Sequence, residues 1–92
     1  MSSTLESTIE RYLVEQVERL GGVAEKTVSP GGRGYFDRVV VLPGGRVIFC
    51  EVKKPKGGLV SPHQKLRHER YRALDVEVAI LRRQSDVDAL LT

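Results

Sequence analysis

Two runs rich in β-branched residues, 36–42 and 46–53, flank the turn Pro43-Gly44-Gly45. This arrangement is typical of a β-hairpin, and it constrains the fold more than any other feature of the chain. If the turn is a three-residue loop, Pro43 takes a helical φ and Gly45 takes the left-handed conformation that follows. The hairpin therefore predicts two antiparallel strands at the centre of the fold.

The register of this hairpin decides which side chains meet. With a three-residue turn Asp37 lies opposite Glu51, whereas a two-residue turn places Asp37 opposite Val52. Directly opposed residues have Cβ atoms about 4.5–5.5 Å apart, and two carboxylates that close repel unless one is protonated or a cation lies between them. Lys53 shares the face of Glu51 because side chains alternate along a strand. The three-residue register therefore predicts a metal site beside an amine.

A helix is expected ahead of the hairpin. Its apolar side chains recur at helical spacing, and they are Leu5, Ile9, Tyr12, Leu13, Val17 and Leu20. Ser3 and Glu6 form an S-x-x-E capping box at its start, and Gly21-Gly22 ends it. A short strand over 23–28 follows, and then a glycine-rich loop over 29–34.

A second helix is expected after the hairpin, running to about Leu74. Ser61 is a good N-cap, Pro62 suits the first helical position, and Gln64 completes an S-x-x-Q capping box. The segment 76–81 then alternates as a strand. A short terminal helix, with its own cap, is expected to start at Ser85.

These elements define an α/β fold with the order α-β-β-β-α-β-α and a mixed central sheet flanked by helices. The β-α-β segment over 49–81 predicts a right-handed crossover, which makes the last strand parallel to the strand of Glu51. The 92 residues are expected to form a single domain, 1–92. A domain this small has marginal stability or shares it with a partner subunit.

Composition narrows the setting of the protein. No apolar stretch is long enough to span a bilayer, and residues 1–6 lack the pattern of a signal peptide. The single cysteine, Cys50, can form neither an internal disulfide nor a zinc site alone. We expect a cytoplasmic protein that has no contact with a membrane.

Positive charge gathers in one part of the chain, although the net charge is only +3. Between residues 53 and 72 there is one acid, Glu69, and seven basic residues: Lys53, Lys54, Lys56, Lys65, Arg67, Arg70 and Arg72. Such clustering suits a polyanion such as nucleic acid. The alternative is an ordinary solvated helix face.

Several segments, taken in order and spacing, resemble one family over nearly the whole chain. They are ESTIE at 6–10, VSPG at 28–31, GYFDR at 34–38, LPGGR at 42–46, EVK at 51–53 and LVSPHQK at 59–65. Together they look like the virus-type replication-repair nuclease (VRR-NUC) domain, in the stand-alone form found in phages and bacteria. The resemblance implies a restriction-endonuclease-like PD-(D/E)xK core, related to Holliday junction resolvases. It also implies a homodimeric, metal-dependent endonuclease acting on branched DNA in a bacterial or phage-infected cell.

Asp37 and Glu51 are the expected metal ligands, since hard carboxylate oxygens suit Mg²⁺ or Mn²⁺. The resemblance adds the backbone carbonyl of Val52 as a third protein ligand. Lys53 is expected to position the attacking water and to stabilise negative charge in the transition state. The alternatives are a loop-end cap for Asp37 and surface charges for Glu51 and Lys53.

The resemblance also implies roles for Glu10 and Gln64. Glu10 matches the family's acid on the first helix, although the sequence alone does not separate it from Glu6 or Glu15. Gln64 matches a glutamine that supports the catalytic lysine or the substrate phosphate, and it could equally serve only the cap of Ser61. His68 is interpreted as a structural or exposed histidine.

One residue departs from the family pattern, because Phe36 stands where most members have a proline before the metal-binding aspartate. Proline supplies no ligand there, so the chemistry is expected to survive while the local geometry changes. The residues expected to contact DNA are Arg33, Lys54, Lys56, Lys65 and Arg67, with a solvated side chain as the alternative for Lys54.

The leading functional hypothesis is a divalent-metal-dependent endonuclease for branched or four-way DNA, with two active sites in a twofold dimer. The first alternative is a nuclease-fold module that binds branched DNA without cutting it, but the intact Asp37, Glu51 and Lys53 argue against it. A protein-interaction domain would leave the basic second helix unexplained.

Overall fold

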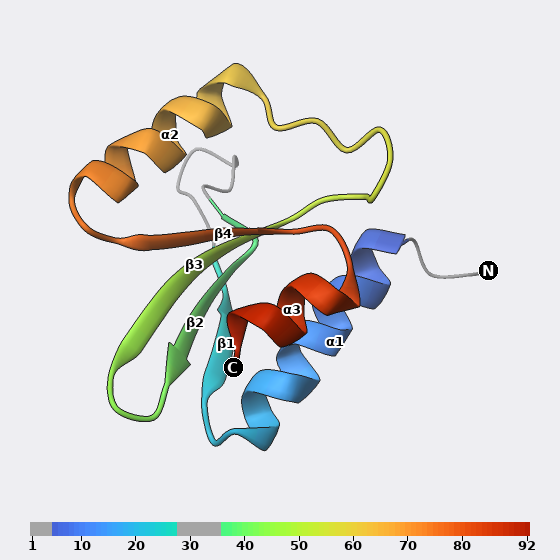
Figure 1. Ribbon diagram of the computed structural model, residues 1–92, viewed down its shortest axis with the longest axis vertical. Helices are drawn as coiled ribbons and strands as arrows, with labels where there is room; N and C mark the ends of the chain where they lie inside the picture. The colour runs from blue at the N-terminus through green and yellow to red at the C-terminus, as the bar shows by residue number, and fades with distance from the viewer. Residues whose placement is uncertain (1–4, 28–35) are drawn as a thin grey trace.

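The computed structural model describes residues 5–27 and 36–92, and its element order confirms the predicted α-β-β-β-α-β-α (Figure 1). The elements are α1 (Leu5–Arg19), β1 (Val23–Lys26), β2 (Arg38–Leu42), β3 (Arg46–Val52), α2 (Pro62–Ala73), β4 (Glu77–Leu81) and α3 (Gln84–Leu90). The predicted cap at Ser3, the whole predicted loop at 29–34 and the predicted DNA contact Arg33 lie outside the described residues.

The four strands form one mixed sheet in the order β1-β2-β3-β4. The pairs β1–β2 and β2–β3 are antiparallel, and β3–β4 is parallel, as the β-α-β segment predicts. Leu42 pairs with Arg46 and Val39 with Phe49, which confirms the register of a three-residue turn. The turn is closed by the Gly45 amide donating to the Leu42 carbonyl, with φ of +89° at Gly44 and +87° at Gly45.

The sheet has two unlike faces, because α1 and α3 cover one of them and α2 lies over the other (Figure 1). The α1/α3 face holds the apolar core, in which Ile48, Cys50 and Val52 of β3 are buried. The alternate residues of β3 point toward α2, where Phe49 contacts Tyr71 at a ring-centroid distance of 5.3 Å. Alternation along β3 thus separates the apolar core from the residues that can do chemistry.

The apolar residues at helical spacing in α1 are not equally buried. Ile9, Leu13 and Val17, spaced by four residues, are buried against the sheet. Leu5 is 61% exposed and Leu20 is 49% exposed. Leu5 is the first helical residue and Leu20 follows the last, so both lie at the ends of the stripe.

The end of α1 follows the predicted glycine cap. The Gly21 amide donates to the Glu18 carbonyl and the Gly22 amide to the Val17 carbonyl, with a φ of +85° at Gly21. These two bonds satisfy carbonyls that the helix leaves unpaired. They also direct the chain straight into β1.

Four strand boundaries differ from the prediction. β1 ends at Lys26, β2 begins at Arg38, β3 ends at Val52 and β4 begins at Glu77. The start of β2 has a local cause, because the Val52 amide donates to the carboxylate of Asp37 instead of to a backbone carbonyl. The ladder therefore stops where a side chain replaces the main chain as acceptor.

The terminal helix begins one residue before the predicted start at Ser85, and its cap is formed differently. The carboxylate of Asp86 accepts the amides of Arg82 and Arg83 at 2.8 and 3.1 Å. An acidic side chain in the first turn thus satisfies amides that precede the helix. Among the described residues, no helix has the length and apolar character needed to cross a membrane.

The two-faced sheet predicts opposite outcomes for neighbouring residues of β3. Ile48 is fully buried, so Ile48→Ala should lower the free energy of unfolding by about 2–5 kcal/mol. Val47 is 40% exposed on the other face, so Val47→Ala should cost less than about 1 kcal/mol. Urea unfolding measures both losses, with Ile48→Val as the milder variant if Ile48→Ala does not fold. A larger loss for Val47→Ala would contradict the assignment of the faces.

Candidate active site

Asp37, Glu51 and Lys53 come together where β2 begins and β3 ends, on the α2 side of the sheet. The Val52 amide donates to Asp37 Oδ2 at 2.6 Å, which fixes the carboxylate of Asp37 beside β3. The amide of Lys53 donates to the Leu81 carbonyl at 2.9 Å, so β4 supports the end of β3. Backbone hydrogen bonds thus hold the two strand ends that carry the predicted site.

Glu51 is the buried centre of this group, with only 4% of its surface exposed. Its Oε2 accepts a hydrogen bond from Gln64 Nε2 at 2.9 Å and lies 3.9 Å from Lys53 Nζ. Burial first, and then the nearby carboxylate of Asp37, raise the pKa of the Glu51 carboxyl to about 7, against the opposing charge of Lys53. Near neutral pH this carboxyl group therefore holds a proton or needs a positive partner.

The chemistry of Asp37 and Glu51 fits a divalent cation. Glu51 Oε1 is buried and has no hydrogen-bond partner among the described residues. A buried polar atom without a hydrogen bond costs about 1–3 kcal/mol of stability. Within residues 5–27 and 36–92 no cluster of three or more His, Cys, Asp or Glu could hold a metal. A cation here would therefore bind Asp37, Glu51, backbone carbonyl oxygen and water, a set typical of Mg²⁺.

Gln64 completes the predicted capping box and also contacts the candidate site. Its side-chain oxygen accepts a hydrogen bond from the Ser61 backbone amide at 3.0 Å, and its backbone amide donates to the Ser61 hydroxyl at 3.2 Å. The same side chain donates through Nε2 to Glu51. The capping box of α2 therefore fixes Gln64 against the predicted metal ligand, whereas the sequence analysis expected a contact with the lysine or phosphate.

His68 is buried, with 2% of its surface exposed, so the alternative of an exposed histidine is wrong. Its Nε2 lies 3.8 Å from Glu51 Oε1 and has no hydrogen-bond partner among the described residues. Burial lowers the pKa of His68 below its usual range, and the charges of Arg72, Arg67 and Lys53 lower it further. The spacing of four residues from Gln64 was a signal for this position, since both side chains share one helix face.

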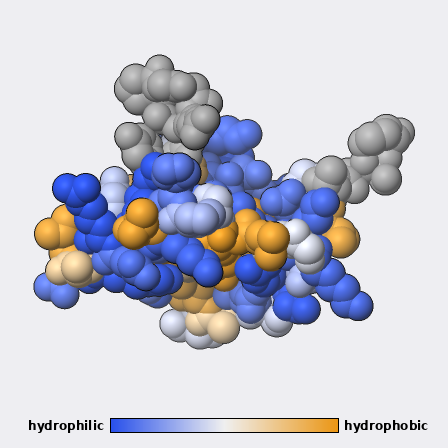
Figure 2. Space-filling view, turned by 90° about the horizontal axis from the view of Figure 1, so that it is seen from above, coloured by the Kyte–Doolittle hydropathy of each residue, from blue (hydrophilic) through white to orange (hydrophobic). Residues whose placement is uncertain are grey.

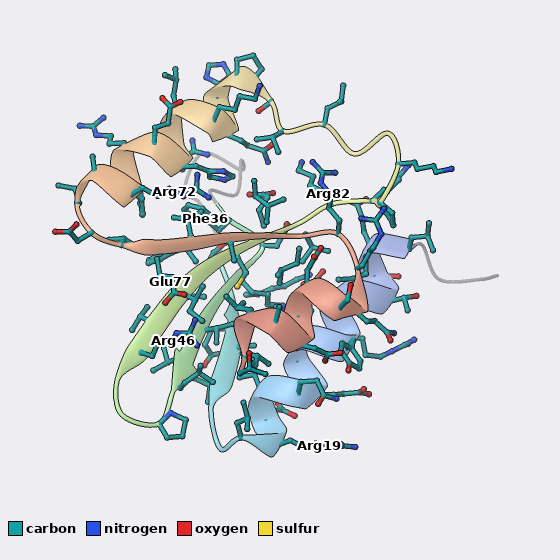
Figure 3. The ribbon with its side chains drawn as sticks, viewed as in Figure 1. Arg19, Phe36, Arg46, Arg72, Glu77 and Arg82 are labelled. Carbon is teal, nitrogen blue, oxygen red and sulfur yellow. The ribbon has the colours of Figure 1, made fainter. Side chains whose placement is uncertain are left out.

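Phe36 supports this side of the site in place of the family's proline. It is 3% exposed, and its ring stacks on that of His68 with a centroid distance of 5.3 Å and an interplanar angle of 14°. It also packs against Phe49 at 5.1 Å and Tyr71 at 5.3 Å. Figure 3 shows Phe36 between α2 and the sheet. The changed local geometry expected at this position thus takes the form of an aromatic cluster.

Glu10 lies on the other side of the sheet. Its Oε2 is 2.7 Å from Arg38 Nε, and Arg38 also donates to the Ala24 carbonyl at 2.9 Å. Arg38 follows Asp37 directly, so the two side chains point to opposite faces. The structure thus pairs Glu10 with Arg38, and the catalytic role of Glu10 stays a prediction.

The predicted DNA contacts fall on two neighbouring segments. Lys54 and Lys56 are exposed in the loop between β3 and α2, while Lys65 and Arg67 lie on α2. Seen from above, this side of the molecule is largely hydrophilic with scattered apolar groups (Figure 2). Lys54, Lys56 and Lys65 are thus exposed on segments next to the end of β3, and Arg67 is half-buried on α2.

Arg82 is a supporting residue that the sequence analysis missed. Its Nη1 donates to the carbonyls of Lys54 and Gly58 at 3.0 and 2.6 Å, which holds the first half of the loop between β3 and α2. Figure 3 shows Arg82 beside this loop. Gly58 allows the close approach, because a Cβ there would lie 2.6 Å from the Lys54 amide. The sequence gives no signal for a contact between an arginine after β4 and a loop after β3.

The fold belongs to the restriction-endonuclease-like class, with a mixed four-stranded sheet between helices. A solved structure described as "VRR_NUC domain" superposes with a TM-score of 0.86 and 37% sequence identity, covering 97% of this chain and 96% of that one. "Putative nuclease p44" of Acyrthosiphon pisum secondary endosymbiont phage 1 is 45% identical over 86 residues, which is 94% of this chain and 90% of that protein. No family model matches the chain.

The chain belongs to the VRR-NUC family, as these two relatives show over nearly its whole length. The family and the fold support a nuclease. The two relatives confirm the predicted family resemblance and fold class, and the structure confirms the predicted element order.

The site predicts an unusual dependence of stability on pH. Folding raises the pKa of Glu51 from 4.5 to about 7, so its stabilising contribution is complete below the unfolded value and is lost as the pH rises through the folded one. In EDTA, the Tm should fall from about pH 5 to about pH 8 by the equivalent of about 2–3 kcal/mol. Glu51→Gln should abolish most of this fall in thermal unfolding scans. A wild-type Tm that is flat over this range would contradict the burial of Glu51.

Proposed function

We propose that this protein is a divalent-metal-dependent, structure-specific DNA endonuclease that hydrolyses phosphodiester bonds in branched DNA, in the manner of a Holliday junction resolvase. The observation that carries the proposal is the buried Glu51 carboxylate, whose pKa is raised to about 7 beside Asp37 and which has one oxygen without a partner among the described residues. Such a group is poised to bind a cation.

Asp37, Glu51 and the backbone carbonyl of Val52 would hold Mg²⁺, with Mn²⁺ as a substitute. The bound ion would supply a water of lowered pKa and neutralise charge on the scissile phosphate. Lys53, with its ammonium 3.9 Å from Glu51 Oε2, would stabilise the negative charge that develops on the phosphate. Gln64 holds the carboxylate of Glu51 in place for this chemistry.

The surrounding basic residues would bind the DNA backbone. Lys54, Lys56, Lys65 and Arg67 are the proposed phosphate contacts, and the residues beside them on α2 strengthen the same field. Arg82 holds the loop of Lys54 and Lys56 next to the end of β3, so these two contacts lie close to Lys53. DNA would thus be bound by the same segment that carries the reacting groups.

The choice of branched DNA and of a homodimer follows from the family resemblance. Cutting two symmetry-related strands of a four-way junction calls for two active sites related by a twofold axis. One domain of this size offers one site, so two copies would be needed. Glu10 and Arg33 complete the proposed set. Glu10 enters as the family's acid on the first helix, although here it pairs with Arg38, and Arg33 as a contact to the DNA backbone.

Lys53→Ala separates this enzyme from a module that binds branched DNA without cutting it. With a labelled four-way junction and Mg²⁺ or Mn²⁺, the wild-type protein should nick the DNA and EDTA should abolish the nicks. The loss of charge stabilisation in Lys53→Ala should slow cleavage by about 100-fold or more, while junction binding in a gel-shift assay persists.

The matched control is Arg19→Ala, which removes an exposed cation at the end of α1, at the opposite end of the molecule from α2 (Figure 3). It should cleave at the wild-type rate. Junction binding by the wild-type protein without nicks under any metal condition would contradict the enzyme and favour the binding module. Nicks that persist in EDTA would contradict the metal.

A further inference from the structure

We propose that His68 is a positioning residue, whose Nε2–H donates to Glu51 Oε1 and, with Gln64, orients this carboxylate for the divalent cation. The inference rests on the proposed metal site and goes beyond it. It assigns a role to the one buried histidine among the described residues.

The first observation is a pair of facing polar atoms, each without a hydrogen-bond partner among the described residues. They are His68 Nε2 and Glu51 Oε1, and they lie 3.8 Å apart. Both are buried, so bulk water does not satisfy them. The separation is longer than a hydrogen bond, but a small side-chain rotation would close it. A nitrogen that faces a carboxylate oxygen at this range is best satisfied as a donor.

The second observation is that two residues on one helix face contact the same carboxylate. Gln64 and His68 are four residues apart on α2, and they lie next to different oxygens of Glu51. Gln64 takes Oε2 at 2.9 Å, and His68 faces Oε1. Each oxygen keeps a second lone pair for a cation. An uncharged imidazole would orient the carboxylate without placing a competing positive charge beside the ion.

The third observation is that the imidazole is fixed by its own packing. Phe36 stacks on the ring at an interplanar angle of 14°, and Phe36 immediately precedes Asp37. The same aromatic contact therefore connects the orientation of His68 to the segment that carries the other proposed ligand. Residues that orient metal ligands commonly act through contacts of this kind.

Mn²⁺ binding by the purified protein without DNA tests the role. His68→Phe preserves the size, burial and stacking of the ring but removes the donor, and it should weaken Mn²⁺ binding by about 10–100-fold in calorimetric titration. His68→Gln places an amide near the position of Nε2 and should recover part of the affinity. The matched control is His63→Gln, which changes an exposed histidine on the same helix and should leave the affinity unchanged.

The outcomes separate this inference from the proposed function. Wild-type affinity in a folded His68→Phe variant would overturn the positioning role while leaving the metal site intact. No Mn²⁺ binding by the wild-type protein would overturn the proposed function, and this inference with it.

A second measurement needs no substitution at all, and so it holds even if the His68 variants fail to fold. Long-range ¹H–¹⁵N spectra of the histidine-labelled wild-type protein report which ring nitrogen carries the proton. The proposal predicts a proton on Nε2 of the buried histidine in the neutral ring. A proton on Nδ1 with a bare Nε2 would overturn it.

Discussion

The burial of the Glu51 carboxylate beside that of Asp37 is the constraint on which the rest of the site depends. Removing a carboxylate from water is costly unless its oxygens are satisfied, and a second carboxylate nearby adds repulsion. Gln64 and Lys53 offset part of this cost from two sides. The remaining oxygen, Oε1, faces His68 and the interior. A site arranged in this way gains most when a cation joins the two carboxylates.

The fold tolerates this unfavourable burial because the two faces of the sheet have different roles. The face toward α1 and α3 carries an apolar core that includes Leu13, Val40 and Ile48, all fully buried. The face toward α2 carries aromatic rings and the ionisable groups of the site. The apolar face thus supplies most of the stability. The other face can therefore hold buried, mutually repelling carboxylates at some cost in stability.

The sequence predicted those features that local chemistry decides. The turn at Pro43-Gly44-Gly45 allowed two strand registers, and the observed one is the three-residue register that brings Asp37 to Glu51. The capping box of Ser61 and Gln64 located the start of α2, whereas the contact of Gln64 with Glu51 was not predicted. In each case neighbours in sequence, or across one tight turn, determine the geometry.

Other features depend on packing between distant segments, which sequence patterns do not record. The stacking of Phe36 on His68 joins the segment before β2 to helix α2, which are far apart in the sequence. The pairing of Glu10 with Arg38 depends on how α1 lies over β2, and only that placement shows it. The exposure of Leu5 and Leu20 likewise depends on where the sheet ends beneath α1.

The central claim is that Asp37 and Glu51 share one cation, and a crystal structure of the protein grown with Mn²⁺ tests it most directly. Anomalous scattering locates the ion without reference to the protein density. The account predicts one strong peak at about 2 Å from a carboxylate oxygen of each residue. A peak bound elsewhere, or these two carboxylates too far apart to reach one ion, would contradict it.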